Sequence, residues 1–175
     1  MTQIFNKKRV NQQFWIKAFD IVGQTATIAF LSMTVIIPYL STRPQHLEVE
    51  ARATINGASI ELEVADTPEE LSRGLKFRKQ LPINRGMLFD LGKRHENVPF
   101  WMHQVKIPLD IIYLDNGVIT YIAANSPPCD ATPESCPIYK APSATHVIEL
   151  NAGRAARLNF QVGDRIKLES RRKII

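Results

Sequence analysis

The sequence predicts a mainly β domain (β-rich α+β) with two short helices, preceded by one N-terminal transmembrane helix. Apolar and polar residues alternate over residues 47–55 and 60–64, which is typical of strands with one buried face. Asn-Gly pairs at positions 56–57 and 116–117 favour the tight turns of β-hairpins. Because such turns join neighbouring antiparallel strands, we expect a compact antiparallel sheet or barrel-like arrangement rather than a parallel α/β sheet.

The net charge of +5 could suggest a nucleic-acid partner, but its distribution along the chain argues against one. Residues 43–170 contain 15 basic and 16 acidic residues, so the body of the protein is close to neutral. The excess of positive charge lies near the N-terminus and in the tail 171–175. Binding to phosphates requires lysines and arginines gathered on one face, and we therefore expect no nucleic-acid partner.

The N-terminal part predicts a membrane anchor. Residues 21–42 carry no charged side chain, and about 20 residues of helix are enough to cross a bilayer. Lys7, Lys8 and Arg9 precede this run, so the positive-inside rule keeps the N-terminus in the cytoplasm. A cleaved signal peptide and a buried soluble helix are the alternatives, although no clear cleavage site follows the apolar run.

The predicted organisation follows from this anchor. We expect residues 1–20 to be cytoplasmic, 21–40 to form a transmembrane anchor or uncleaved signal, and 41–46 to be a linker. Residues 47–170 form the β-rich domain, and 171–175 form a basic tail. The protein would be single-pass in an inner or thylakoid membrane, with its domain on the periplasmic or lumenal side.

The first predicted helix has clear start and stop signals. Thr67 and Glu70 form a capping box, Pro68 suits the first helical position, and Gly74 ends the helix. Further strands are predicted at residues 86–89, 98–105, 109–114, 118–123, 145–150 and 165–169. We expect residues 90–97 to be a solvated loop, 125–142 a proline-rich loop, and 152–158 a second short helix capped by Asn151.

The two cysteines, Cys129 and Cys136, lie in the same proline-rich loop. Outside the cytoplasm the simplest interpretation of so close a pair is a disulfide that closes this loop. Two free thiols and a catalytic thiol pair are the alternatives. The four histidines show no ligand spacing, so we expect no metal site and no cofactor.

A few residues could carry chemistry or recognition. Asp110 could be a general base or a ligand anchor, although a hydrogen bond to the local backbone is the simpler interpretation. His103 alternates with Trp101 along a predicted strand, and an exposed Trp101 would mark a recognition surface. Glu149 is expected on the solvent side of its strand. If it points inward it needs a partner, which Arg78 or Arg73 could supply.

Residues 55–169 resemble the bacterial and archaeal family DUF192. The resemblance is carried by Arg73-Gly-Leu-Lys-Phe-Arg78, Gly86-Met-Leu-Phe89, Phe100-Trp-Met102, Ile107-Pro-Leu-Asp110, Pro127-Pro-Cys129, Cys136-Pro137, Tyr139, Val147-Ile-Glu-Leu150, Ala152-Gly153 and Val162-Gly-Asp164. It implies a compact β-rich domain, often exported or membrane-anchored, without a settled activity. His103 and Gln104 stand where the family usually has Lys-Asn, so any chemistry of that pair is altered here.

The leading functional hypothesis is a non-enzymatic accessory domain. It would bind a small ligand or an envelope partner through a surface formed by Trp101, His103, Asp110 and the cysteine loop, with Glu149 and Arg78 as further candidates. One alternative is a small hydrolase or transferase that uses Asp110 and His103 as an acid–base pair. A third is a thiol-redox protein that uses Cys129 and Cys136. Because no complete catalytic set is apparent, we favour a protein that is not an enzyme.

Overall fold

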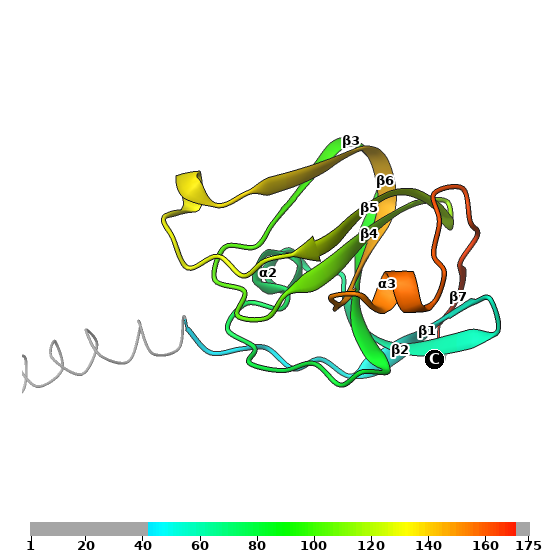
Figure 1. Ribbon diagram of the computed structural model, residues 1–175, viewed down its shortest axis with the longest axis horizontal. Coiled ribbons are helices and arrows are strands. Elements are labelled where there is room, and N and C mark those ends of the chain that lie inside the picture. Colours follow the sequence, from blue (N-terminus) through cyan, green and yellow to red (C-terminus); the bar gives the residue numbers. More distant parts are fainter. Residues whose placement is uncertain (1–41, 171–175) are drawn as a thin grey trace, which may run out of the picture. The chain divides into compact units, whose positions relative to one another are not determined.

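The computed structural model describes residues 42–170, and these residues contain one seven-stranded sheet (Figure 1). The strand order is β5-β4-β6-β3-β2-β1-β7. The strands are β1 (Val49–Ile55), β2 (Ala58–Ala65), β3 (Arg85–Trp101), β4 (Leu109–Asp115), β5 (Val118–Ser126), β6 (Ile138–Asn151) and β7 (Lys167–Ser170). Two short α-helices, α2 (Pro68–Arg73) and α3 (Arg154–Arg157), and a 3₁₀ turn, η1 (Pro133–Ser135), complete the domain. The predicted mainly β class with two short helices is confirmed.

Neighbouring strands are antiparallel with one exception, the parallel pair β2–β3. The prediction of a wholly antiparallel sheet is therefore wrong at this pair. The connection from β2 to β3 contains α2 and a long loop, residues 66–84. A crossover of a dozen or more residues is what parallel pairing requires, because the chain must return to the end where it started.

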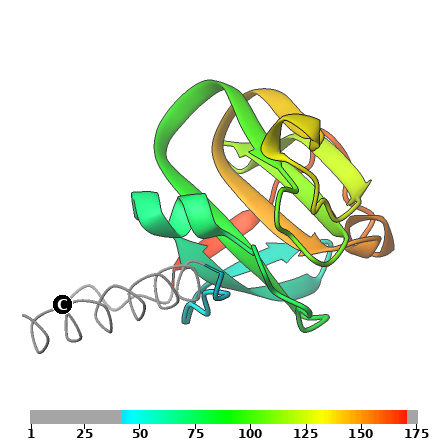
Figure 2. The same ribbon diagram turned by 90° about the vertical axis from the view of Figure 1, so that its left-hand side faces the viewer.

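The sheet is curled, and its two edges approach each other at one end. β3 and β6 are long strands that lie side by side in both views (Figures 1 and 2). The edge strands are β5 and β7. The N–H of Ile119 in β5 donates to the carbonyl of Asp164, and the N–H of Ile166, just before β7, donates to the carbonyl of Gly117. These bonds join the segment before β7 to the start of β5, so the sheet forms a half-barrel.

Both faces of the sheet are buried, each against its own hydrophobic cluster. Met87, Phe89, Ile111, Tyr113 and Val147 belong to one cluster, together with residues of the loop that follows α2. The other cluster contains residues such as Ile60, Leu62, Ile112, Ile148 and Phe160. Side chains alternate between the two faces along each strand, so a polar residue on either face can be enclosed.

The local signals in the sequence are confirmed. Asn56 and Gly57 turn β1 into β2 with positive φ angles of 51° and 76°. Asn116 and Gly117 do the same between β4 and β5, with φ angles of 49° and 80°. Helix α2 begins with the complete capping box of Thr67 and Glu70 and ends at Gly74.

Several predicted boundaries are wrong. Residues 90–97, expected as a loop, belong to β3; Asp90, His95 and Glu96 pair with β6, with a shift of register between Asp90 and His95. β6 begins at Ile138, inside the predicted loop 125–142, and β3 ends at Trp101 rather than at residue 105. Gly153 (φ 75°), not Asn151, precedes α3. Polar exposed segments can still be strands when a neighbouring strand supplies hydrogen bonds to their backbone.

Within residues 42–170, no helix has the length and apolar character needed to cross a membrane. The predicted cytoplasmic segment 1–20, the anchor 21–40 and the basic tail 171–175 lie outside the described residues.

Candidate functional site

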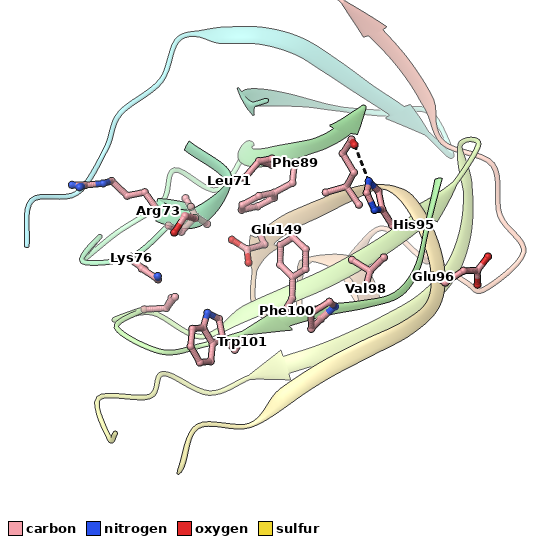
Figure 3. A pocket seen from close by; sticks show the side chains of 16 residues that line it. Leu71, Arg73, Lys76, Phe89, His95, Glu96, Val98, Phe100, Trp101 and Glu149 are labelled. Carbon is pink, nitrogen blue, oxygen red and sulfur yellow. Dashed lines mark hydrogen bonds between the residues drawn. The ribbon is translucent and has the colours of Figure 1, made fainter. Parts of the chain in front are cut away.

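A cavity of about 510 Å³ lies between one face of the sheet and the segment that begins in α2 (Figure 3). The walls come from α2 and its following loop, from β3, and from one residue each of β6 and the turn after β3. The lining residues are Leu71, Ser72, Arg73, Gly74, Leu75, Lys76, Phe89, Leu91, His95, Glu96, Val98, Pro99, Phe100, Trp101, Val105 and Glu149. The volume is that of a pocket for a small molecule.

The loop after α2 is held in place by hydrogen bonds from distant parts of the chain. The side-chain amide of Gln45 donates to the carbonyls of Glu70 and Gly74, at 2.9 and 3.0 Å. The Glu70 carbonyl also accepts the N–H of Gly74, so the Gln45 amide binds the segment before β1 to the C-terminal end of α2. Further along, the N–H of Phe77 donates to the carbonyl of Gln104 at 2.8 Å. The cavity wall is therefore fixed at both ends.

Aromatic side chains form the core of the opposite wall. The rings of Phe89 and Phe100 meet edge to face with 4.9 Å between their centroids. Phe100 in turn packs against Tyr113, whose hydroxyl donates to the carbonyl of Tyr139 at 2.9 Å. Because Phe89 and Phe100 come from the two ends of the bent strand β3, the curl of the sheet is what brings them together.

Glu149 points into this cavity. It lies near the C-terminal end of β6, paired with Met87 on one side and with Ile111 on the other, and only 3% of the residue is exposed. In Figure 3 its carboxyl group lies among the cavity-lining side chains with Phe89 and Phe100. Its Oε2 is buried and has no hydrogen-bond partner. The expectation that Glu149 faces solvent is wrong, because both faces of β6 are covered.

Burial governs the protonation of Glu149. Loss of hydration raises the pKa of its carboxyl group to about 8, although the positive charge of Arg78 acts in the opposite direction. At neutral pH the group is therefore mostly a neutral carboxylic acid, which can both donate and accept a hydrogen bond. A buried carboxyl group with a strongly perturbed pKa inside a cavity is a candidate functional group.

Arg78 lies behind the cavity wall and pairs with Glu63, a residue that the sequence did not single out. Two of its nitrogens donate to the two carboxylate oxygens of Glu63, at 2.8 and 2.5 Å, and both side chains are almost fully buried. The third, Nε, donates to the carbonyl of Gln45 at 2.9 Å, and the N–H of Leu47 donates to Glu63 at 2.8 Å. The predicted linker 41–46 is therefore bound to the domain at Gln45.

The Glu63–Arg78 pair also decides how Glu63 titrates. Burial alone would raise the pKa of Glu63, but the hydrogen bonds from Arg78 and from the Leu47 backbone, with the charge of Arg78, outweigh it and lower the pKa. Apolar and polar residues alternate along β2, so the sequence predicts that Glu61 and Glu63 lie on the same polar face. Nothing within the strand distinguishes Glu63 from the less buried Glu61. Only the packing of residues 45–47 and 78 against β2 separates the two.

Lys76 and Trp101 lie at the edge of the cavity. The Lys76 ammonium is 5.8 Å from the centre of the Trp101 ring, within the range of a cation–π contact. Partial burial, and then the positive charge of Arg73, lower the pKa of Lys76. Trp101 is 38% exposed, and its ring is 5.3 Å from the ring of His103. His103 itself does not line the cavity.

Asp110 has a different role from the one expected for a ligand surface. It is fully buried, and its carboxylate accepts hydrogen bonds from the backbone N–H groups of Asn125, Gly153 and Ala155, at 2.8, 3.1 and 2.8 Å. It therefore ties the start of β4 to the end of β5 and to the start of α3. Asp110 does not line the cavity, and the structure corrects its placement on a surface with Trp101 and His103.

Cys129 and Cys136 form the predicted disulfide, with 5.8 Å between their Cα atoms. The bridge encloses η1, and the backbone of Cys129 contacts the segment after β3, since the N–H of Gln104 donates to the Cys129 carbonyl at 2.8 Å. Among residues 42–170, no group of three or more His, Cys, Asp or Glu side chains is arranged to hold a metal ion.

Taken together, the curled mixed sheet, the α2 crossover and the cavity beneath α2 define a small, β-rich, single-sheet domain. A family model matches residues 51–168, and the chain belongs to that family, DUF192, described as "Uncharacterized ACR". This confirms the resemblance seen in the sequence. Among proteins with curated descriptions, none matches the chain.

Two solved structures are similar to this one. A protein of unknown function from Novosphingobium aromaticivorans DSM 12444 is 33% identical with a TM-score of 0.58, and the match covers 67% of this chain and 83% of that one. A protein from Sinorhizobium meliloti 1021, described as a putative transcription regulator, is 30% identical with a TM-score of 0.59. In that case the match covers 72% of this chain and 98% of the relative.

Proposed function

We propose that this protein is a membrane-anchored, exported accessory domain that binds a small ligand in the cavity beneath α2. The observation that carries the proposal is Glu149, a nearly fully buried carboxyl group whose Oε2 has no partner and which faces a cavity of about 510 Å³. Buried polar groups are almost always hydrogen-bonded, and leaving one unpaired costs about 1–3 kcal/mol. A ligand that supplies the missing partner would recover this free energy.

The surroundings of Glu149 favour binding over catalysis. The catalytic alternative assigned acid–base roles to Asp110 and His103, but neither lines the cavity, and the Asp110 carboxylate is already bound by three backbone N–H groups. Most of the cavity wall is apolar, as expected of a site that encloses a carbon skeleton and orients it with a few polar groups.

Two observations support the exported location. Residues 21–42 form an uncharged run preceded by Lys7, Lys8 and Arg9. Cys129 and Cys136 are joined in a disulfide, which persists mainly in oxidising compartments. A disulfide is also the oxidised state of a thiol-redox pair, so the thiol-redox alternative is tested by the reactivity of Cys129 in the reduced protein.

An envelope partner is a second candidate. Trp101 and Ile138 are opposite each other in the β3–β6 pair, and both are exposed, at 38% and 52%. Neighbouring exposed apolar side chains of this size mark contact surfaces. The Sinorhizobium relative is described as a transcription regulator, but for this chain the balanced charge of residues 43–170 does not favour a role on nucleic acid.

A thermal-shift screen of small molecules against Pro44–Ile175 tests cavity binding. This segment is a compact unit, and the match to the Sinorhizobium structure, which covers 98% of that chain and 72% of this one, supports its use on its own. Ligands of the cavity should raise the Tm of the wild type but not that of Leu71→Trp, which fills the cavity from α2. If every stabilising compound acts equally on both proteins, cavity binding is refuted.

A further inference from the structure

The cavity combines an apolar body with polar groups of defined charge, and this combination restricts what it can bind. Leu71, Phe89, Val98 and Phe100 line its walls. Such walls favour a hydrocarbon or aromatic skeleton, because about 25 cal/mol is gained for each Å² of apolar surface removed from water. The polar groups of the cavity determine which ligand charge it favours.

Glu149 provides a neutral hydrogen-bonding group rather than a negative charge. With a pKa of about 8, its carboxyl group carries a proton on most molecules at pH 7. A protonated carboxyl group donates a hydrogen bond to an acceptor such as a carboxylate, carbonyl or hydroxyl oxygen. It therefore does not exclude an anion, and an amine would have to remove its proton to gain an ion pair.

The edge of the cavity carries positive charge. Lys76 and Arg73 both line it, and they are close enough for the charge of Arg73 to lower the pKa of Lys76. Within residues 42–170, no carboxylate forms an ion pair with Lys76, whose ammonium instead lies over the Trp101 ring. Glu96 also lines the cavity, but its carboxylate is already paired with Arg94.

We propose that the ligand is a small amphipathic anion whose negative group binds Lys76 at the edge of the cavity. Its apolar skeleton would lie against Phe89 and Phe100, and a second oxygen of the natural ligand would meet the unpaired Oε2 of Glu149. This inference rests on the proposed cavity function and names its ligand class. A cation would meet the charges of Lys76 and Arg73, whereas a purely apolar ligand would leave Glu149 without a partner.

Three probes with one skeleton and different charge test this proposal: 4-phenylbutyrate, 4-phenylbutylamine and 4-phenylbutanol. Their affinities for Pro44–Ile175 at pH 7 are measured by isothermal titration calorimetry. We expect the carboxylate to bind about tenfold more tightly than the alcohol, since a charge-assisted hydrogen bond contributes about 1.5 kcal/mol or more. The amine should bind more weakly than the alcohol.

Two lysine variants test whether the preference for the carboxylate comes from Lys76. Lys76→Gln should remove the preference for the carboxylate, measured as the ratio of the carboxylate affinity to the alcohol affinity in the same protein. Lys79→Gln, an exposed lysine three residues further on that does not line the cavity, should keep the full preference. If Lys79→Gln loses the preference as much as Lys76→Gln, the effect is one of general charge and the proposed contact is refuted.

The outcomes separate the ligand class from the cavity function. If the alcohol or the amine binds as tightly as the carboxylate, and Leu71→Trp abolishes that binding, the cavity binds ligands but the anion proposal fails. If no probe binds the wild type more tightly than it binds Leu71→Trp, both the anion proposal and the proposed function fail.

Discussion

Arg78 binds Glu63 through two hydrogen bonds, at 2.8 and 2.5 Å, and leaves Glu149 with only its distant electrostatic influence. Glu63 lies in β2 and Glu149 in β6, with β3 between the two strands, and both residues are nearly fully buried. One is ionised and enclosed by donors, and its pKa is lowered; the other lacks a partner, and its pKa is raised. The domain therefore encloses one satisfied and one unsatisfied acid, and these should respond to pH in opposite ways.

Glu149→Gln should make the domain more stable than the wild type at alkaline pH. The folded pKa of Glu149, about 8, lies above its ordinary value of 4.5, so between these values the folded state binds more protons than the unfolded state. The free energy of unfolding then falls as pH rises, by at most roughly 4–5 kcal/mol over the whole window. Gln cannot ionise, so the variant lacks this loss. Urea unfolding at pH 5, 6.5 and 8.5 measures the difference.

The expected difference between variant and wild type is near zero at pH 5 and grows to several kcal/mol at pH 8.5. Arg78 and Tyr113 interact electrostatically with Glu149, and burial raises the pKa of Tyr113 far above this window. Glu61→Gln, on a partly exposed residue of β2, is the control and should show no such growth. A constant difference across the three pH values would show that Glu149 is not protonated in the folded protein.

Arg78→Met should destabilise the domain strongly. It leaves the Glu63 carboxylate buried without its partner and removes the donor to the Gln45 carbonyl. Removing one member of a buried ion pair costs about 3–5 kcal/mol. Arg85→Met is the matched control, since Arg85 pairs with Glu61 on the same strand at 4.0 Å with both side chains partly exposed. That change should cost no more than about 1 kcal/mol.

The effect of Arg78→Met should also depend on pH. The pKa of Glu63 is lowered from 4.5, so the stabilisation by the pair is complete above this value and is lost as pH falls through the folded pKa. Hydrogen exchange at residues 45–47 gives an independent measurement, because the pair holds this segment. Unchanged protection there in the variant would contradict the role assigned to Arg78.

Asp110→Asn should lower stability without altering the cavity. The Asn amide is uncharged and has a single acceptor oxygen, so the N–H groups of Asn125, Gly153 and Ala155 all lose a charged acceptor, and at least one loses its acceptor altogether. We expect a loss of about 2–4 kcal/mol in the free energy of unfolding, because bonds to charged groups are worth about 1.5–3 kcal/mol each. Asp130→Asn, at an exposed pair with Lys106, should change stability little. Lost probe binding with unchanged stability would restore Asp110 as a site residue.

Removal of the disulfide should loosen the loop that encloses η1. Cys129→Ser with Cys136→Ser, or reduction of the wild type, is expected to cost about 2–3 kcal/mol, since the closed loop is short. Denaturation with and without reductant measures this. In the reduced wild type both thiols should be alkylated slowly and at equal rates. Much faster labelling of Cys129 would instead support the thiol-redox hypothesis.

The features predicted correctly depend on residues close together in the sequence. The turn at Asn56-Gly57 and the capping box of Thr67 and Glu70 each form within four residues, and the cysteines are seven apart. The interactions that stabilise these features lie within a few residues of each other, so the sequence pattern is enough to predict them. The strand 90–97 was missed because its polar side chains resemble a loop, while its backbone hydrogen bonds come from β6, about fifty residues away along the chain.

From the sequence alone follow the mainly β class, the hairpins, the first helix, the cysteine pair and the family. Only the tertiary structure decided whether each glutamate is buried and whether its carboxyl group has a partner. Glu63 alternates with apolar residues along β2, and Glu149 was expected on the solvent side of its strand, yet each is buried, because the curled sheet is covered on both sides. Whether a buried acid is paired depends on which distant side chain reaches it. Arg78 reaches Glu63, and Glu149 remains facing the cavity.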